Sequence, residues 1–232
     1  MANYEKYDYR QVWAGKRLED AAQKHIISSW LTPAERCLEL GCGFGRITQI
    51  LEPTFRDIFA LEYTPRNLTI AKQRLKKTNL ARADISRIPA RDSSFDCVVM
   101  IRVIHLLPDP TAVLREVARV SKDGATVIIS MPNLAMNNLL WAARGLRTRN
   151  SARGPFVWPY DAGPYFVPIS DIAPSALRLD NRRGTGLLDN AAGKLLERFT
   201  HLYLLDVATS PLWFFKLDVF LKFRVVKTQG DK

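Results

Sequence analysis

The chain has 232 residues, of which 47% are apolar and 25% charged, an ordinary composition for a globular protein with one sizeable core. The net charge of +11 is spread over both halves of the chain, so it indicates solubility and loose attraction for anions rather than one particular function. No apolar stretch approaches the ~18 residues of a membrane helix, and the first residues contain no apolar run of the signal-peptide type.

The cysteines indicate the redox environment. Cys37, Cys42 and Cys97 have no C-x-x-C spacing, and two of them fall within apolar segments that predict buried strands. Reduced thiols in a cytoplasmic protein are the plain interpretation.

The first 31 residues predict an amphipathic helix. Four aromatic residues lie between positions 4 and 13, and apolar residues then follow at helical spacing until shortly before Pro33. We expect the aromatic residues to pack on the domain, with a lid over the ligand as the alternative interpretation.

The central stretch of the sequence is residues 36–46. A short apolar strand, residues 37–40, is followed by Gly41, Gly43 and Gly45 and then by apolar residues with the spacing of a helix face. The Gly-x-Gly-x-Gly spacing differs from the Gly-x-Gly-x-x-Gly of dinucleotide sites, and no Gly-Lys-Ser/Thr follows, which excludes a P-loop. Glu39 places an anion where a pyrophosphate would have to lie, so the loop suits a ligand that carries an ammonium group.

Four further apolar segments predict strands at residues 57–62, 80–85, 95–101 and 125–130, with helices at 65–75 and 111–120 between them. From residue 216 the chain alternates apolar and polar residues, which predicts a final antiparallel strand. The fold class is therefore α/β: a Rossmann-like, doubly wound and mostly parallel sheet of seven strands, with an antiparallel last strand and an insertion or cap after the fifth.

We expect one domain over residues 1–232. Its parts are an N-terminal lid or helix (1–31), a cofactor-binding core (32–130), a substrate-side insertion (131–186) and a C-terminal helix with strands (187–232). The insertion is predicted to contain a helix at 134–146 and an aromatic loop that roofs the site. Its arginines suit either an acidic substrate or a solvated surface: Arg144, Arg147, Arg149, Arg153, Arg178, Arg182 and Arg183.

Three segments extend the motif of the glycine loop. They are residues 83–96, the run Val103-Ile104-His105-Leu106-Leu107-Pro108-Asp109-Pro110, and residues 114–120. With Glu39-x-Gly41-x-Gly43-x-Gly45, in this order and spacing, the first half of the chain resembles class I S-adenosylmethionine-dependent methyltransferases. More narrowly, it resembles their small-molecule group, which includes quinone and natural-product methyltransferases.

The resemblance implies S-adenosyl-L-methionine as cofactor and S-adenosyl-L-homocysteine as product. It places Glu39 and the glycine loop (Gly41, Cys42, Gly43) near the methionyl amine, and Glu62 at the ribose. Asp84 is expected to accept from the adenine amino group, with Ile85 and Tyr63 against the ring. Ile101 and Arg102, at the end of the fourth strand, complete the expected cofactor-binding set.

The predicted reaction is methyl transfer to a small, aromatic, amphipathic or acidic acceptor through an oxygen, nitrogen or carbon atom. Proximity supplies most of the acceleration, and His105 is the candidate general base, or else a residue that only lines the pocket. No metal site is expected. The alternatives are an RNA (tRNA or rRNA) methyltransferase, which lacks a recognisable RNA-binding module here, a catalytically silent partner subunit, and a nicotinamide dehydrogenase, which the glycine spacing disfavours.

Overall fold

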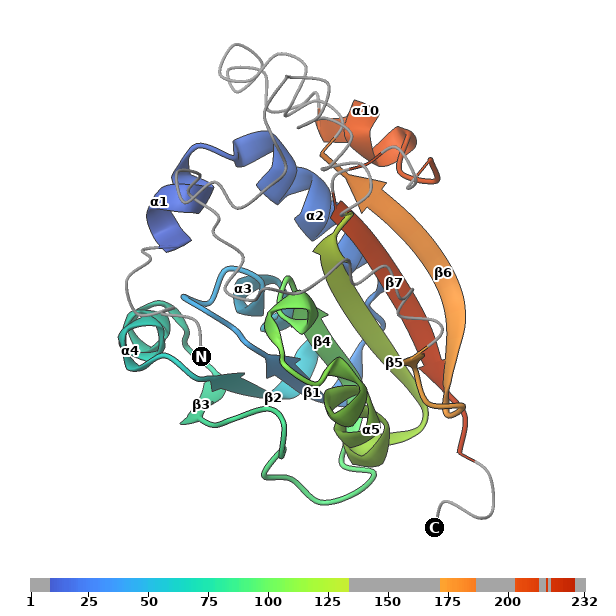
Figure 1. Cartoon of the computed structure of the whole chain (residues 1–232). Coiled ribbons are helices and arrows are strands. Elements are labelled where there is room, and N and C mark those ends of the chain that lie inside the picture. The colour runs from blue at the N-terminus through green and yellow to red at the C-terminus, as the bar shows by residue number, and fades with distance from the viewer. Residues whose placement is uncertain (1–8, 134–171, 187–202, 213–215, 217, 228–232) are drawn as a thin grey trace.

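A computed structural model (Figure 1) describes residues 9–133, 172–186, 203–212, 216 and 218–227. Its helices are α1 (Tyr9–Ala14), α2 (Arg17–Trp30), α3 (Thr48–Leu51), α4 (Pro65–Arg74), the 3₁₀ turn η2 (Ile104–Leu106), α5 (Pro110–Val120) and α10 (Tyr203–Ala208). Its strands are β1 (Ala34–Leu40), β2 (Phe55–Glu62), β3 (Thr78–Arg82), β4 (Phe95–Ile101), β5 (Ser121–Pro132), β6 (Leu177–Thr185) and β7 (Asp218–Val225). None of the helices within these ranges is long and apolar enough to cross a membrane.

The seven strands form one sheet in the order β3-β2-β1-β4-β5-β7-β6. Strands β1 to β5 are parallel to one another, whereas β7 runs antiparallel to both β5 and β6. The chain order reverses between β1 and β4, so their carboxyl ends form the edge at which α/β sheets of this kind bind ligands.

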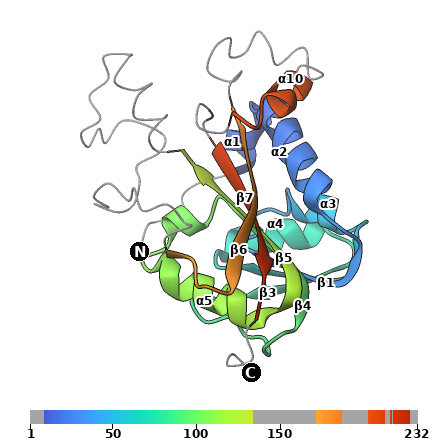
Figure 2. The same ribbon diagram turned by 90° about the vertical axis from the view of Figure 1, so that its right-hand side faces the viewer.

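Helices cover both faces of the sheet, which explains why the central strands are apolar on both sides. Figure 2 shows α5 on one side and α2 and α3 on the other. Val113, Leu114 and Val117 of α5 pack on the first face, and Ile26 and Ile27 of α2 pack on the second.

The fold class predicted from the sequence is confirmed, including the antiparallel strand near the C-terminus. The predicted third strand was too long, since β3 ends at Arg82 and the chain turns before Ile85 enters the core. The predicted helix after the glycine loop is a single turn, α3. The helices predicted at 134–146 and 187–199 lie outside the described residues.

Two features of the C-terminal half differ from the sequence pattern. The edge strand β6 lies inside the segment expected as an insertion, so Arg178, Arg182 and Arg183 belong to the sheet. Lys216 and Asp218 were expected on a polar face, but both are buried because α10 and α2 supply polar partners for them.

Lys216 fastens α10 to the sheet. Its ammonium group is fully buried and donates to Asp206 Oδ1 (2.5 Å), the Asp206 carbonyl (3.2 Å) and Thr209 Oγ1 (2.7 Å). The second carboxylate oxygen of Asp206 accepts from the Gly186 amide at 2.8 Å, just beyond the end of β6. Every proton of the buried cation therefore has an acceptor.

We predict that Asp206→Ala lowers the free energy of unfolding by about 3–5 kcal/mol, because it leaves the Lys216 ammonium buried without its carboxylate. The double variant Asp206→Leu/Lys216→Met removes both charges and should be less destabilised than the single variant. Urea unfolding followed by circular dichroism measures both.

Asp180→Ala is the matched control, because the Asp180–Lys222 pair on the same part of the sheet is half exposed. It should change stability by less than about 0.5 kcal/mol. Equal losses for Asp206→Ala and Asp180→Ala would contradict this account of the buried pair.

Candidate functional site

The glycine loop leaves β1 in a conformation that only glycine adopts readily. Gly41, Gly43 and Gly45 have φ angles of 74°, 56° and 83°. The amides of Gly41 and Cys42 both donate to the Leu61 carbonyl, at 2.8 and 3.1 Å, which ties the loop to β2. A Cβ atom at Gly41 would lie 2.5 Å from a Val103 methyl group, whereas one at Gly43 would meet nothing within 4 Å. The loop thus packs closely on Val103 at Gly41, whereas the space beside Gly43 is open.

Glu62, the last residue of β2, holds the open part of the loop. Its side chain is 7% exposed. Oε2 accepts from the Gly43 amide and Oε1 from the Thr64 amide, both at 2.8 Å. Because each carboxylate oxygen carries two lone pairs, Glu62 keeps acceptor capacity for the hydroxyl groups of a ligand.

Glu39 provides a second carboxylate beneath the same loop. It is almost fully buried and accepts from Thr48 Oγ1 at 2.6 Å. Burial raises the pKa of Glu39 to about 7, against the lowering effects of the Thr48 hydrogen bond and the Arg46 charge. Burial, together with the charges of Glu39 and Glu62, also raises the pKa of the Cys42 thiol, which keeps it protonated.

Arg46 occupies the position of the third glycine of a dinucleotide motif, and its side chain contacts the N-terminal helices α1 and α2. Its guanidinium donates to Asp20 (2.7 Å) and Gln23 (2.8 Å) of α2. The ring of Trp13, from α1, lies over the same guanidinium with 3.6 Å between the Arg46 Cζ atom and the ring centroid. Residues 9–30 are therefore fastened directly to the glycine loop.

Arg102 extends this charged network to the end of the sheet. It has a positive φ of 58°, and its guanidinium donates to both Asp218 carboxylate oxygens, at 2.5 and 2.6 Å. Gln23 donates to Asp218 as well, at 2.9 Å. Burial raises the pKa of Asp218 to about 7, although the Arg102 charge opposes the rise. The geometry thus joins Arg102 to β7 and α2.

The remaining expected cofactor residues lie around the same edge of the sheet. Tyr63 is 44% exposed beside Arg82, whose Nε donates to the Tyr63 carbonyl at 3.1 Å. Asp84 is exposed and accepts from the Ser86 amide at 2.9 Å, whereas Ile85 packs into the core. Ile101 is buried at the end of β4. These positions stay predictions as cofactor contacts.

His105 lies on η2, directly after β4. Burial, with a smaller contribution from the Arg102 charge, lowers the pKa of His105 to about 3. The imidazole is therefore neutral at neutral pH and has a lone pair for a proton, but it is a weak base in this conformation.

Sequence reasoning found the two carboxylates and the glycine loop but missed the partners that hold them. Thr48 and Gln23 carry no local signal, and Asp218 contacts Gln23 across 195 residues of sequence. The one available hint was Arg46, whose long basic side chain replaces a glycine of the dinucleotide motif.

Comparison with known proteins identifies the domain. Residues 38–129 match a family described as a methyltransferase domain. A probable S-adenosylmethionine-dependent methyltransferase of Mycobacterium tuberculosis is 30% identical over 105 residues, which cover 43% of this chain and 38% of that protein. The malonyl-[acyl-carrier protein] O-methyltransferase of Serratia marcescens is 28% identical over 116 residues, or 50% of this chain and 43% of that protein. The chain thus spans about two fifths of the length of these relatives.

Solved structures agree on the fold at low identity. A methyltransferase in complex with the Haloferax volcanii Trm112 activator is 15% identical with a TM-score of 0.64, covering 95% of this chain and 99% of that chain. A possible histamine N-methyltransferase of Thermotoga maritima is 17% identical with a TM-score of 0.64 and 93% coverage of both chains. Over residues 38–129 the chain therefore matches a methyltransferase domain, and its fold is shared with solved methyltransferase structures.

Proposed function

We propose that the protein transfers a methyl group from S-adenosyl-L-methionine to a small-molecule acceptor. The observation that carries the proposal is the pair of buried carboxylates, Glu39 and Glu62, on the two sides of one glycine loop. A dinucleotide would bring its pyrophosphate into this anionic pocket, whereas S-adenosylmethionine brings an ammonium, a sulfonium and two ribose hydroxyls. These two carboxylates, both hydrogen-bond acceptors, therefore fit this cofactor.

Each of the expected cofactor residues has a proposed role in holding S-adenosyl-L-methionine. Glu39 faces the methionyl amine through the loop formed by Gly41, Cys42 and Gly43. Glu62 accepts from the ribose hydroxyls, and Asp84 and Ile85 receive the adenine. Tyr63, Ile101 and Arg102 border the same edge of the sheet, with Arg102 acting through its contacts to Asp218 rather than as a direct ligand.

The bound cofactor supplies an activated methyl group on a positive sulfur. The protein holds the acceptor in line with that methyl group and excludes water, which accounts for most of the acceleration. An acceptor that must lose a proton needs a base, and His105 is the candidate for that role because it is neutral and follows β4 directly. The lowered pKa suits acceptors that are themselves acidic.

The chemical class of the acceptor is the least constrained part of the proposal. Names of similar proteins include an O-methyltransferase, a C-24-methyltransferase and an N-methyltransferase, so the attacking atom differs among these proteins. The Haloferax neighbour acts with the Trm112 activator, which makes a small activator protein a second kind of partner to test. We further propose a cytoplasmic protein with one domain over residues 1–232.

Calorimetric titration with S-adenosylmethionine, S-adenosylhomocysteine and NAD tests the cofactor. We expect the first two to bind and NAD to give no heat. Glu62→Gln should weaken binding by roughly 10- to 100-fold, because the acceptor loses its charge and its new NH2 group faces one of the two amide donors, Gly43 or Thr64.

Glu52→Gln is the matched control. Like Glu62, Glu52 accepts hydrogen bonds from backbone amides, those of Lys76 and Lys77, and it accepts a third from Thr78 Oγ1, but it lies away from the glycine loop. Its affinity for S-adenosylmethionine should equal that of the wild type. Binding of NAD alone, or equal losses in both variants, would contradict the assignment.

The affinity for S-adenosylmethionine should depend on pH through Glu39. An ammonium group requires the ionised carboxylate, and the pKa of Glu39 is about 7. Lowering the pH from about 8 to about 6 should therefore weaken binding by about tenfold, as the carboxylate takes up a proton.

Glu39→Gln should bind weakly at every pH and lose this dependence. Burial also raises the pKa of Asp218, which remains in the variant, so a pH dependence that persists unchanged in Glu39→Gln would contradict the role of Glu39. A wild-type affinity that is constant over this range would show that Glu39 does not face the amine.

A further inference from the structure

A local excess of positive charge lies next to the proposed cofactor edge. Residues 63–91 contain eight basic residues and one acidic residue, Asp84, so this eighth of the chain has a net charge of +7. All eight basic side chains are exposed, on α4, in the connection to β3, on β3 and in the loop to β4: Arg66, Lys72, Arg74, Lys76, Lys77, Arg82, Arg87 and Arg91. We call this surface the basic rim.

Most members of the basic rim form no ion pair with a described carboxylate. Among the described residues, seven of its members lie beyond 4.0 Å of any carboxylate oxygen: Lys72, Arg74, Lys76, Lys77, Arg82, Arg87 and Arg91. Some other cations of the described residues are paired, as in Arg102–Asp218 and Lys216–Asp206. Glu52 lies near Lys77 and Glu116 near Arg87, but the rim as a whole keeps an excess of positive charge. Such a local excess favours a polyanionic partner.

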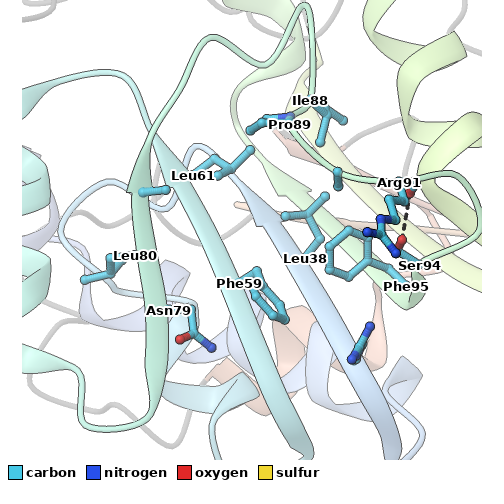
Figure 3. Close-up of a pocket in the computed structure, with 13 residues that line it drawn as sticks. Leu38, Phe59, Leu61, Asn79, Leu80, Ile88, Pro89, Arg91, Ser94 and Phe95 are labelled. Atoms are coloured by element: carbon cyan, nitrogen blue, oxygen red, sulfur yellow. Dashed lines mark hydrogen bonds between the residues drawn. The ribbon is translucent and has the colours of Figure 1, made fainter.

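A groove opens between β3 and the loop that leads to β4. It has a volume of about 400 Å³ and is lined by Asn79, Leu80 and Ala81 of β3 and by Pro89, Ala90 and Arg91 of the following loop. Figure 3 shows Phe59, Leu38 and Phe95 within it, between Leu80 and Asn79 on one side and Arg91 and Ser94 on the other. The rings of Phe59 and Phe95 meet edge to face, with 5.7 Å between their centroids. The groove is thus apolar and aromatic within, and basic at its margin.

This combination selects one class of polyanion. Single-stranded nucleic acid needs cations for its phosphates and recessed aromatic surface for its bases, and the rim and groove supply both. A membrane surface would need protruding apolar side chains, but Tyr63 is the one large apolar side chain that the described residues 63–91 leave exposed. An acidic protein would use the cations but leave the aromatic groove unexplained.

We propose that the basic rim and the groove bind single-stranded nucleic acid. The phosphates lie along α4, β3 and the loop to β4, and a base enters the groove against Phe59. The rim borders Tyr63 and Glu62, so the bound strand passes beside the proposed methyl donor site. A nucleic-acid ligand goes beyond the proposed function, and its binding can be measured without methyl transfer.

Fluorescence anisotropy with labelled single-stranded RNA and DNA of roughly 12 nucleotides tests the proposal. The variant Lys72→Gln/Lys76→Gln/Lys77→Gln/Arg87→Gln should bind at least about tenfold more weakly. The slope of log affinity against log salt concentration should become shallower by about 3, because each phosphate that is no longer neutralised accounts for about 0.7 of the slope. Phe59→Leu should bind at least about fivefold more weakly with the salt slope unchanged, because it removes stacking rather than charge.

The matched control Arg56→Gln/Arg115→Gln/Arg178→Gln/Arg224→Gln removes four exposed charges outside residues 63–91 and should bind like the wild type. Circular dichroism and calorimetry with S-adenosylmethionine check that all variants fold and keep the cofactor site, which separates failure of this proposal from failure of the proposed function. A preference for RNA or for DNA identifies the natural ligand, and either supports the proposal.

Three results would overturn it. The first is that neither oligonucleotide binds the wild-type protein at low salt. The second is that the rim variant and the control lose affinity equally, which would mean attraction to net charge alone. The third is that polyglutamate or phosphatidylglycerol vesicles bind more tightly than both oligonucleotides.

Discussion

The contact between Glu62 and the glycine loop is the constraint on which the proposed site depends. Gly43 has a φ angle of 56°, and its amide has no partner from a regular helix or strand. Glu62 accepts from that amide and from Thr64 at once, so a single carboxylate fixes both the loop after β1 and the turn after β2. The same carboxylate, with Glu39, makes the pocket anionic. Loop geometry and ligand preference therefore have a common cause.

A second layer of charge keeps that arrangement in place. Arg46 connects the loop to α2, and Arg102 connects the end of β4 to β7 through Asp218. Gln23 links these two contacts, since it accepts from Arg46 and donates to Asp218. These groups are mostly buried, so removing any one of them leaves another unsatisfied in a medium that solvates charge poorly. We infer that α2 is a structural part of the site rather than a cover added to it.

The elements that the sequence predicts are those whose packing leaves a local pattern of apolar residues. The parallel strands were predicted correctly because burial on both faces gives unbroken apolar runs, as in β4, and β7 was found because its apolar residues alternate. Strand β6 was missed because an exposed edge strand with the sequence Leu-Arg-Leu-Asp-Asn-Arg-Arg-Gly-Thr needs no apolar pattern. The limit of β3 was wrong for a related reason: Ile85 is apolar, but it reaches the core from a turn that Asp84 stabilises, not from a strand. Contacts such as Gln23–Asp218 join residues that no local pattern relates.

The distribution of charge relates the cofactor pocket to the surface beside it. Negative charge is buried under the glycine loop at Glu39 and Glu62, and positive charge is exposed immediately afterwards in the sequence, along α4 and β3. Buried carboxylates act at short range in a poorly screened medium, which suits a small cation held in one geometry. Exposed cations act over about a Debye length, ~8–10 Å at ordinary salt, which suits the capture of an extended anion. The two charge sets thus serve different ligands without competing, because one is enclosed and the other is spread over the surface. Methyl transfer adds a reason for placing the buried carboxylates next to the basic rim. A positive sulfonium held by the carboxylates attracts an anionic acceptor held by the rim.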